Sequence, residues 1–149
     1  MALFHLILLI LMELNMSFDI IEEDIKHFVK SKAEYVQVVG KAYARLWPTV
    51  KEQISKNPDV EFLPIELANS TGESVPDTLA FLTYLSGQRA NLLHARFFFK
   101  DEEGKEYEIK ALQVSDVLNK KEFRHPETKE IVSEPDTKIW MVYQLQKNR

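Results

Sequence analysis

Cysteine is absent from this chain of 149 residues. Its absence excludes disulfide bonds, thiol nucleophiles, and zinc or iron–sulfur sites with cysteine ligands. It does not identify the compartment, because a cytoplasmic protein needs no cysteine and an exported protein with a good core needs no disulfide. We expect a cytoplasmic protein, with export or membrane association as open alternatives.

Signatures of catalysis are also missing. Only four glycines occur, and none belongs to a phosphate-binding loop or to a Gly-x-Ser-x-Gly motif. The histidines lie far apart, with no His-Glu-x-x-His or His-x-His spacing among them; they are His5, His27, His94 and His125. The sequence therefore predicts no catalytic residue, no metal site and no cofactor, and it favours a protein that is not an enzyme.

Basic residues are not in excess. The formal net charge of −4 argues against a nucleic-acid partner, because that kind of binding depends on neutralising phosphates. Hydrophobic residues make up 45% of the chain and charged residues 28%, which are the proportions of an ordinary globular protein. We therefore expect a folded chain whose partner is a protein or a second copy of itself.

The longest apolar run covers residues 2–12 and is too short to cross a bilayer, which needs about 20 residues. It is also a poor signal peptide, because no lysine or arginine precedes it and no small-x-small cleavage site follows it. Three interpretations stay open: a buried helix, an unusual export or anchoring segment, or an extension upstream of a natural start at Met16. We treat residues 1–16 as an apolar N-terminal segment and residues 17–149 as a single α+β domain, and we expect membrane contact only through residues 1–12.

Two helices are predicted at the start of this domain. Ser17 is expected to cap the first, which carries apolar side chains at three- and four-residue steps. The second is expected over about residues 32–55. Pro48 should kink or break it near Leu46 and Trp47, because proline removes a backbone donor and clashes with the preceding turn.

A strand and a third helix are predicted next. Residues 60–67 alternate well enough to form a strand, with Pro64 at an edge or a bulge. Ser74 and Asp77 form a capping box at the start of the following helix. Gly87 is expected to end that helix in the left-handed conformation.

A β-hairpin is predicted over residues 90–114, because apolar residues fill both arms and Asp-Glu-Glu-Gly between them is typical of a turn. A three-residue loop closed by a left-handed Gly104 sets the register. This register joins opposite charges and aligns apolar residues on one face. The predicted pairs are Asp101–Lys105, Lys100–Glu106, Phe99–Tyr107, Phe97–Ile109 and Ala95–Ala111.

The reverse face of the sheet is also predicted to be apolar. Residues 138–146 form a final strand and residues 130–132 a brief one. The apolar residues of the reverse face are Phe98, Leu112, Trp140 and Val142. A sheet that is apolar on both faces needs a second cover, which is either the N-terminal run or a second copy of the chain. We predict that these four residues form a protein interface.

The order of elements predicts an α+β fold in which N-terminal helices pack on one face of a mostly antiparallel sheet. This layout is similar to that of the cystatin-like superfold, which includes nuclear transport factor 2-like domains. The resemblance implies helices in the concavity of a bent sheet and an outer sheet face that pairs with another subunit.

One group of polar residues is a candidate ligand site. The hairpin residues in it are His94, Arg96, Glu108 and Lys110, and the helix residues Tyr43 and Trp47 complete the candidate pocket. A solvated patch on the hairpin and two core aromatics on the helix are the simpler interpretation.

Three hypotheses follow. The favoured one is a non-enzymatic binding or assembly module that self-associates, or docks a protein partner, through the apolar sheet face. The first alternative is a small-molecule-binding protein or enzyme with a pocket between the long helix and the sheet. The second alternative is a membrane-tethered subunit of a larger complex.

Overall fold

The computed structural model describes residues 2–146, except the side chains of residues 7, 10 and 11. Over these residues the fold is α+β, with six helices and a four-stranded antiparallel sheet of strand order β1-β4-β2-β3. The chain divides into two compact units. The first contains the chain up to His94 and from Tyr143 onwards, and the second contains residues 95–142.

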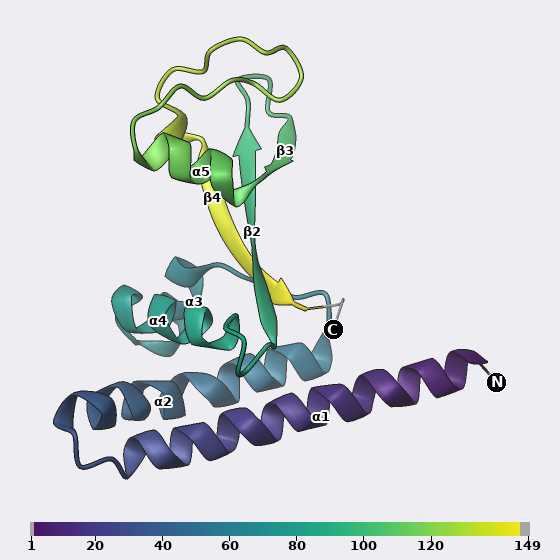
Figure 1. Ribbon diagram of the computed structural model, residues 1–149, viewed down its shortest axis with the longest axis vertical. Helices are drawn as coiled ribbons and strands as arrows, with labels where there is room; N and C mark the ends of the chain where they lie inside the picture. Colours follow the sequence, from purple (N-terminus) through teal and green to yellow (C-terminus); the bar gives the residue numbers. More distant parts are fainter. Residues whose placement is uncertain (1, 147–149) are drawn as a thin grey trace. The chain divides into compact units, whose positions relative to one another are not determined.

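The helices of the first unit are α1 (Ala2–Val29), α2 (Glu34–Lys56), α3 (Pro64–Thr71) and α4 (Val75–Leu85). Helices α1 and α2 lie side by side and antiparallel, and the N-terminal part of α1 extends past the end of α2 (Figure 1). Gly40 of α2 allows this close packing, because a Cβ atom there would lie 2.6 Å from the Cβ of Phe28.

The predicted start of the first helix at Ser17 is wrong. Helix α1 begins at Ala2 and passes through Ser17, whose side chain is buried. Leucine and methionine, which dominate the preceding stretch, are good helix formers, and no glycine or proline interrupts it. The apolar N-terminal segment and the predicted first helix are therefore one continuous helix.

Of the kink or break predicted at Pro48, the break does not occur. Helix α2 continues through the proline, and Leu46, Trp47 and Val50 around it are buried. A proline inside a helix costs about 3 kcal/mol, and burying each large apolar side chain contributes about 1.5–3 kcal/mol. Packing on both sides of Pro48 therefore outweighs the loss of one backbone hydrogen bond.

The strand predicted over residues 60–67 is mostly absent. Strand β1 covers only Glu61–Phe62, and Pro64 begins α3. Proline at the first helical position loses no hydrogen bond, because that N–H has no partner within a helix. The sequence prediction placed this proline at a strand edge and missed its helix-starting role.

Of the predicted capping box of α4, the Ser74 half is confirmed, since the Ser74 hydroxyl accepts a hydrogen bond from the backbone N–H of Asp77 at 3.2 Å. The predicted left-handed ending at Gly87 is wrong. Among the described glycines, only Gly72 and Gly104 have positive φ angles. The helix instead ends at Leu85, and Ser86, its C-cap residue, donates its backbone N–H to the Leu82 carbonyl.

Aromatic rings fill the core of the first unit. Tyr43 packs on Phe81 with 4.8 Å between ring centroids, and Trp47 packs edge-on against Phe18 at 5.2 Å. Both Tyr43 and Trp47 are buried. They therefore act as core residues, which was the simpler of the two interpretations.

The second unit is organised by the hairpin of β2 (Leu93–Lys100), whose first two residues belong to the first unit, and β3 (Glu106–Ile109). The predicted register is confirmed by the pairs Lys100–Glu106, Phe99–Tyr107 and Phe97–Ile109. Gly104 has a φ of 83°, as the three-residue loop requires. In the turn, the backbone N–H of Asp101 donates to the Lys105 carbonyl at 3.0 Å.

The predicted pair of Ala95 and Ala111 is wrong, because β3 ends at Ile109 and helix α5 covers Ala111–Leu118. Lys110 is the N-cap residue of α5, and its backbone N–H donates to the side chain of Gln113 at 2.9 Å. Gln113, which caps α5, lies in a stretch where polar and apolar residues alternate as in a strand. The sequence prediction assigned this stretch to the hairpin because of that alternation.

Helix α5 and the loop after it cover the aromatic face of the hairpin (Figure 1). Phe99 and Ile109 form a core with Phe123 from the loop, and Val114 and Val117 of α5 pack against it. The strand predicted at residues 130–132 is reduced to one bridge between Arg124 and Ile131. The short helix η1 (Pro135–Thr137) then leads into β4 (Ile139–Leu145), which confirms the predicted final strand.

The predicted apolar reverse face is smaller than expected. Phe98 stacks on Trp140 with 5.7 Å between centroids, and the Arg96 guanidinium lies 5.0 Å from the Phe98 ring. Val142 is buried, and Leu112 lies in α5 rather than in a strand. Of the four residues predicted for the interface, only Phe98 and Trp140 thus remain as a half-exposed pair on the sheet.

Candidate functional site

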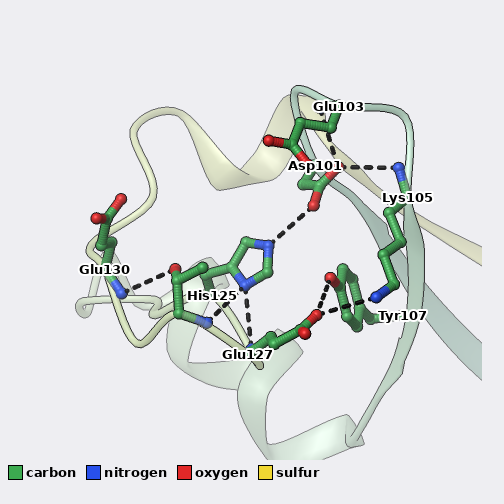
Figure 2. A network of polar contacts seen from close by, with 8 residues as sticks. Asp101, Glu103, Lys105, Tyr107, His125, Glu127 and Glu130 are labelled. Carbon is green, nitrogen blue, oxygen red and sulfur yellow. Dashed lines mark hydrogen bonds and ion pairs between the residues drawn. The ribbon is translucent and has the colours of Figure 1, made fainter.

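Two features of the described chain are candidates for function: a polar network with a cavity in the second unit, and an apolar surface on α1 in the first. The network joins the hairpin turn to the loop after α5 (Figure 2). At its centre the Nε2 atom of His125 lies 3.0 Å from Oδ2 of Asp101. A histidine next to an aspartate is a common catalytic arrangement, so its geometry decides what it can do.

Both ring nitrogens of His125 are engaged. Nδ1 accepts hydrogen bonds from the backbone N–H groups of Glu127 and Thr128, at 3.0 and 3.1 Å. An acceptor nitrogen carries no proton, so Nε2 must carry the ring proton and donate it to Asp101. The imidazole therefore has no free lone pair with which to take a proton from a substrate. It instead links the hairpin turn to the loop after α5, and we call this link the His125 bracket.

Asp101 is held from both sides. Its Oδ1 accepts the backbone N–H groups of Glu103 and Lys105, at 3.0 and 2.9 Å, while Oδ2 accepts from His125. The hydrogen bond from His125 and those from the turn backbone lower the pKa of the Asp101 carboxyl below its ordinary value. The aspartate is therefore charged at neutral pH.

A second carboxylate fastens the other side of the loop. Oε2 of Glu127 accepts from the Tyr107 hydroxyl at 2.6 Å and from Nζ of Lys105 at 3.1 Å (Figure 2). These hydrogen bonds, Tyr107 first and Lys105 second, lower the pKa of Glu127. The bond to Glu127 raises the pKa of the Tyr107 hydroxyl, which keeps the tyrosine protonated at neutral pH.

A cavity of about 460 Å³ lies beside this network. Phe99, Tyr107, Ile131 and Val132 supply apolar walls, and the remaining lining is mixed in charge, with Lys105 and Lys138 among several carboxylates. Among the described residues, no buried side-chain nitrogen or oxygen lacks a hydrogen-bond partner. The polar groups thus satisfy one another, and the network holds the loop in place.

This assignment predicts the effect of Asp101→Asn. The amide would present an N–H to the N–H of His125, whose other nitrogen is already occupied, so the loop should detach from the turn. We expect several-fold faster hydrogen exchange at the backbone amides of Glu127 and Thr128. Glu102→Gln, at the next position and on an exposed side chain, is the control. Equal exchange rates in the two variants would contradict the bracket.

The residues predicted for a ligand pocket do not line this cavity. Arg96 and Glu108 form an ion pair on the hairpin, with 2.6 Å between Nη2 and Oε1, and Lys110 begins α5. His94 pairs through Nδ1 with the Gln146 side chain at 2.9 Å. Tyr43 and Trp47 are packed in the core of the first unit.

The second candidate is the N-terminal half of α1, residues 2–16, which we call the apolar arm. Seven of its described large apolar side chains are 44–71% exposed; they are Leu3, Phe4, Leu6, Leu8, Leu9, Met12 and Met16. Monomeric proteins rarely expose contiguous apolar patches larger than about 300–600 Å². The apolar run was evident in the sequence, but none of its three open interpretations was an exposed helix continuous with the folded unit.

The remaining observations do not assign a chemistry. In residues 2–146 no helix has both the length and the hydropathy needed to span a membrane. The side chains that the structure describes contain no cluster of three or more histidine or acidic residues that could hold a metal ion. No protein-family model, curated protein or solved structure matches the chain.

Proposed function

We propose that this protein is a non-enzymatic assembly module that self-associates through the apolar arm. The observation that carries the proposal is the exposure of seven large apolar side chains along one half of one helix. A helix with a broad apolar surface normally buries that surface against protein or lipid. Covering the arm with another polypeptide removes this apolar surface from water, which is the dominant driving force of protein association.

The arm replaces the sheet face as the proposed interface. Phe98 and Trp140 cover each other in part by stacking, and the Arg96 guanidinium covers the Phe98 ring. The ligand-pocket alternative is less well supported, because Tyr43 and Trp47 are packed in the core. The membrane-tethered alternative depends on the same arm and is separated from self-association by experiment.

The test compares the mass of the full chain in solution with that of a triple variant, Leu9→Ser/Met12→Ser/Met16→Ser. We expect the wild-type chain to sediment as a dimer or larger species and the variant to sediment as a monomer. All three residues are exposed in the single chain, so the substitutions should change stability by no more than about 0.5 kcal/mol each.

The matched control is Leu112→Ser/Leu118→Ser, which replaces two exposed leucines on α5. This variant should associate as the wild-type chain does. A wild-type chain that stays monomeric at all concentrations would refute the proposed function. So would association that the α5 variant loses and the arm variant keeps.

A further inference from the structure

The outer face of the arm has the spacing of a helix-pairing seam. His5, Leu9, Met12 and Met16 follow one another at steps of four, three and four residues, the repeat that keeps one stripe facing a partner helix. At 3.6 residues per turn, Leu9 is turned by about 180° from Phe18. Phe18 packs against Trp47 of α2, so the seam lies on the side of α1 that faces away from α2.

The far end of the arm has no neighbour in α2, because α1 extends past the end of that helix (Figure 1). Leu9, Met12 and Met16 are each 47–64% exposed.

Charge determines which partner and which direction fit the arm. No lysine or arginine precedes Lys26, and the seam leads into Asp19 and Glu23, which are exposed. Anionic lipid surfaces attract lysine and arginine, so this charge pattern disfavours a membrane. A parallel pair would bring Asp19 and Glu23 of both copies side by side, which is unfavourable, whereas an antiparallel pair places them at opposite ends.

An antiparallel seam pairs residues whose numbers have a constant sum, and one register keeps all four seam residues in contact. In it His5 lies opposite Met16 of the second copy, and Leu9 lies opposite Met12. The two copies make the same contacts in reverse, so the pairs His5–Met16 and Leu9–Met12 each occur twice. This gives the closed two-fold interface that is commonest among homo-oligomers.

We propose that the apolar arms of two copies pair with each other as antiparallel helices, with His5 against Met16 and Leu9 against Met12. This inference rests on the proposed function, since it identifies the surface that the arm binds. It goes beyond that function by specifying that the two arms contact each other as antiparallel helices and by giving the register of the pair.

The absence of cysteine makes disulfide cross-linking a direct test in the full-length chain. His5→Cys and Met16→Cys are prepared separately, at two exposed positions. In the proposed pair these two positions are opposite each other, within the 4.4–6.8 Å between Cα atoms that a disulfide needs. Two copies of the same position lie eleven residues apart along the axis, about 16 Å at 1.5 Å per residue.

We expect a mixture of the two variants to form several-fold more disulfide dimer under mild oxidation than either variant alone. In a parallel pair each variant would cross-link with itself, and that result would overturn the inference while leaving the proposed function standing. A wild-type dimer that gives no cross-link in the mixture would do the same. A wild-type chain that is monomeric and floats with phosphatidylcholine vesicles would refute both the inference and the proposed function.

Discussion

Gly40→Ala should lower the free energy of unfolding by about 2–3 kcal/mol, the cost of forcing an extra carbon into a packed core. A Cβ at position 40 would lie 2.6 Å from the Cβ of Phe28 and 2.8 Å from the backbone N of Val29. Part of the obstruction is the backbone of α1, which cannot rotate away as a side chain can. Alanine favours a helix over glycine by about 1 kcal/mol, so the clash must exceed this gain.

Chemical denaturation of the full chain measures this effect as a lower midpoint with an unchanged slope. Gly87→Ala is the matched control, because its new Cβ would come only within 3.3 Å of the Tyr84 carbonyl oxygen. We expect a much smaller change there. If Gly40→Ala is as stable as Gly87→Ala, then α1 and α2 do not pack closely at Phe28.

Asp24→Asn should destabilise the first unit by about 2–3 kcal/mol, since the amide cannot accept all of the hydrogen bonds that the buried carboxylate receives. The Asp24 carboxylate is only 6% exposed and accepts hydrogen bonds from Nε and Nη2 of Arg89, at 2.7–2.9 Å. The Tyr84 hydroxyl donates to it at 2.6 Å. Arg89 is itself 71% exposed, which places the expected loss below the largest values seen for buried pairs.

The same carboxylate predicts a dependence on pH. The hydrogen bonds from Arg89 lower the pKa of Asp24 below its usual value, so folding favours the charged form. Its contribution to stability is complete above the usual pKa of about 3.9 and is lost as the pH falls through the lowered pKa. The stability difference between wild type and Asp24→Asn should therefore be constant near neutral pH and shrink in acid.

Denaturation at several pH values tests both statements, with Glu23→Gln as control at the adjacent exposed position. That variant should match the wild-type chain at neutral pH. Equal stabilities of Asp24→Asn and Glu23→Gln would contradict the role given to Asp24. A difference that persists unchanged below the lowered pKa would contradict the assigned cause.

The hairpin was predictable in detail because its information is local. Gly104 and the polar residues before it define the loop, and the loop defines which side chains face each other. The strand prediction failed beyond Ile109 because α5 has the same apolar content as a strand, and only the Gln113 cap distinguishes them. At Ser17 the good helix formers before it extend the helix, and Pro64 takes the helix-starting role, so each residue with two possible roles took the other one.

The candidate sites were predictable to different degrees. The apolar run was evident as sequence, but its exposure depends on where α2 ends, which is a tertiary fact. The bracket formed by Asp101 and His125 joins residues 24 positions apart, and neither belongs to a motif. Asp101 was interpreted only as a turn residue, and a histidine directly before a proline gave no sign of its partner.

The chain enters and leaves the second unit at adjacent points. The backbone N–H of Gln146 donates to the carbonyl of Leu92 at 2.7 Å, directly beside the positions where residues 95–142 begin and end. Residues 95–142 are therefore inserted in the first unit as a loop is. If they were removed, a tight turn would be long enough to join the two cut ends. The first unit could therefore be grafted with foreign sequence at this junction, or shortened there, without altering the order of its own helices.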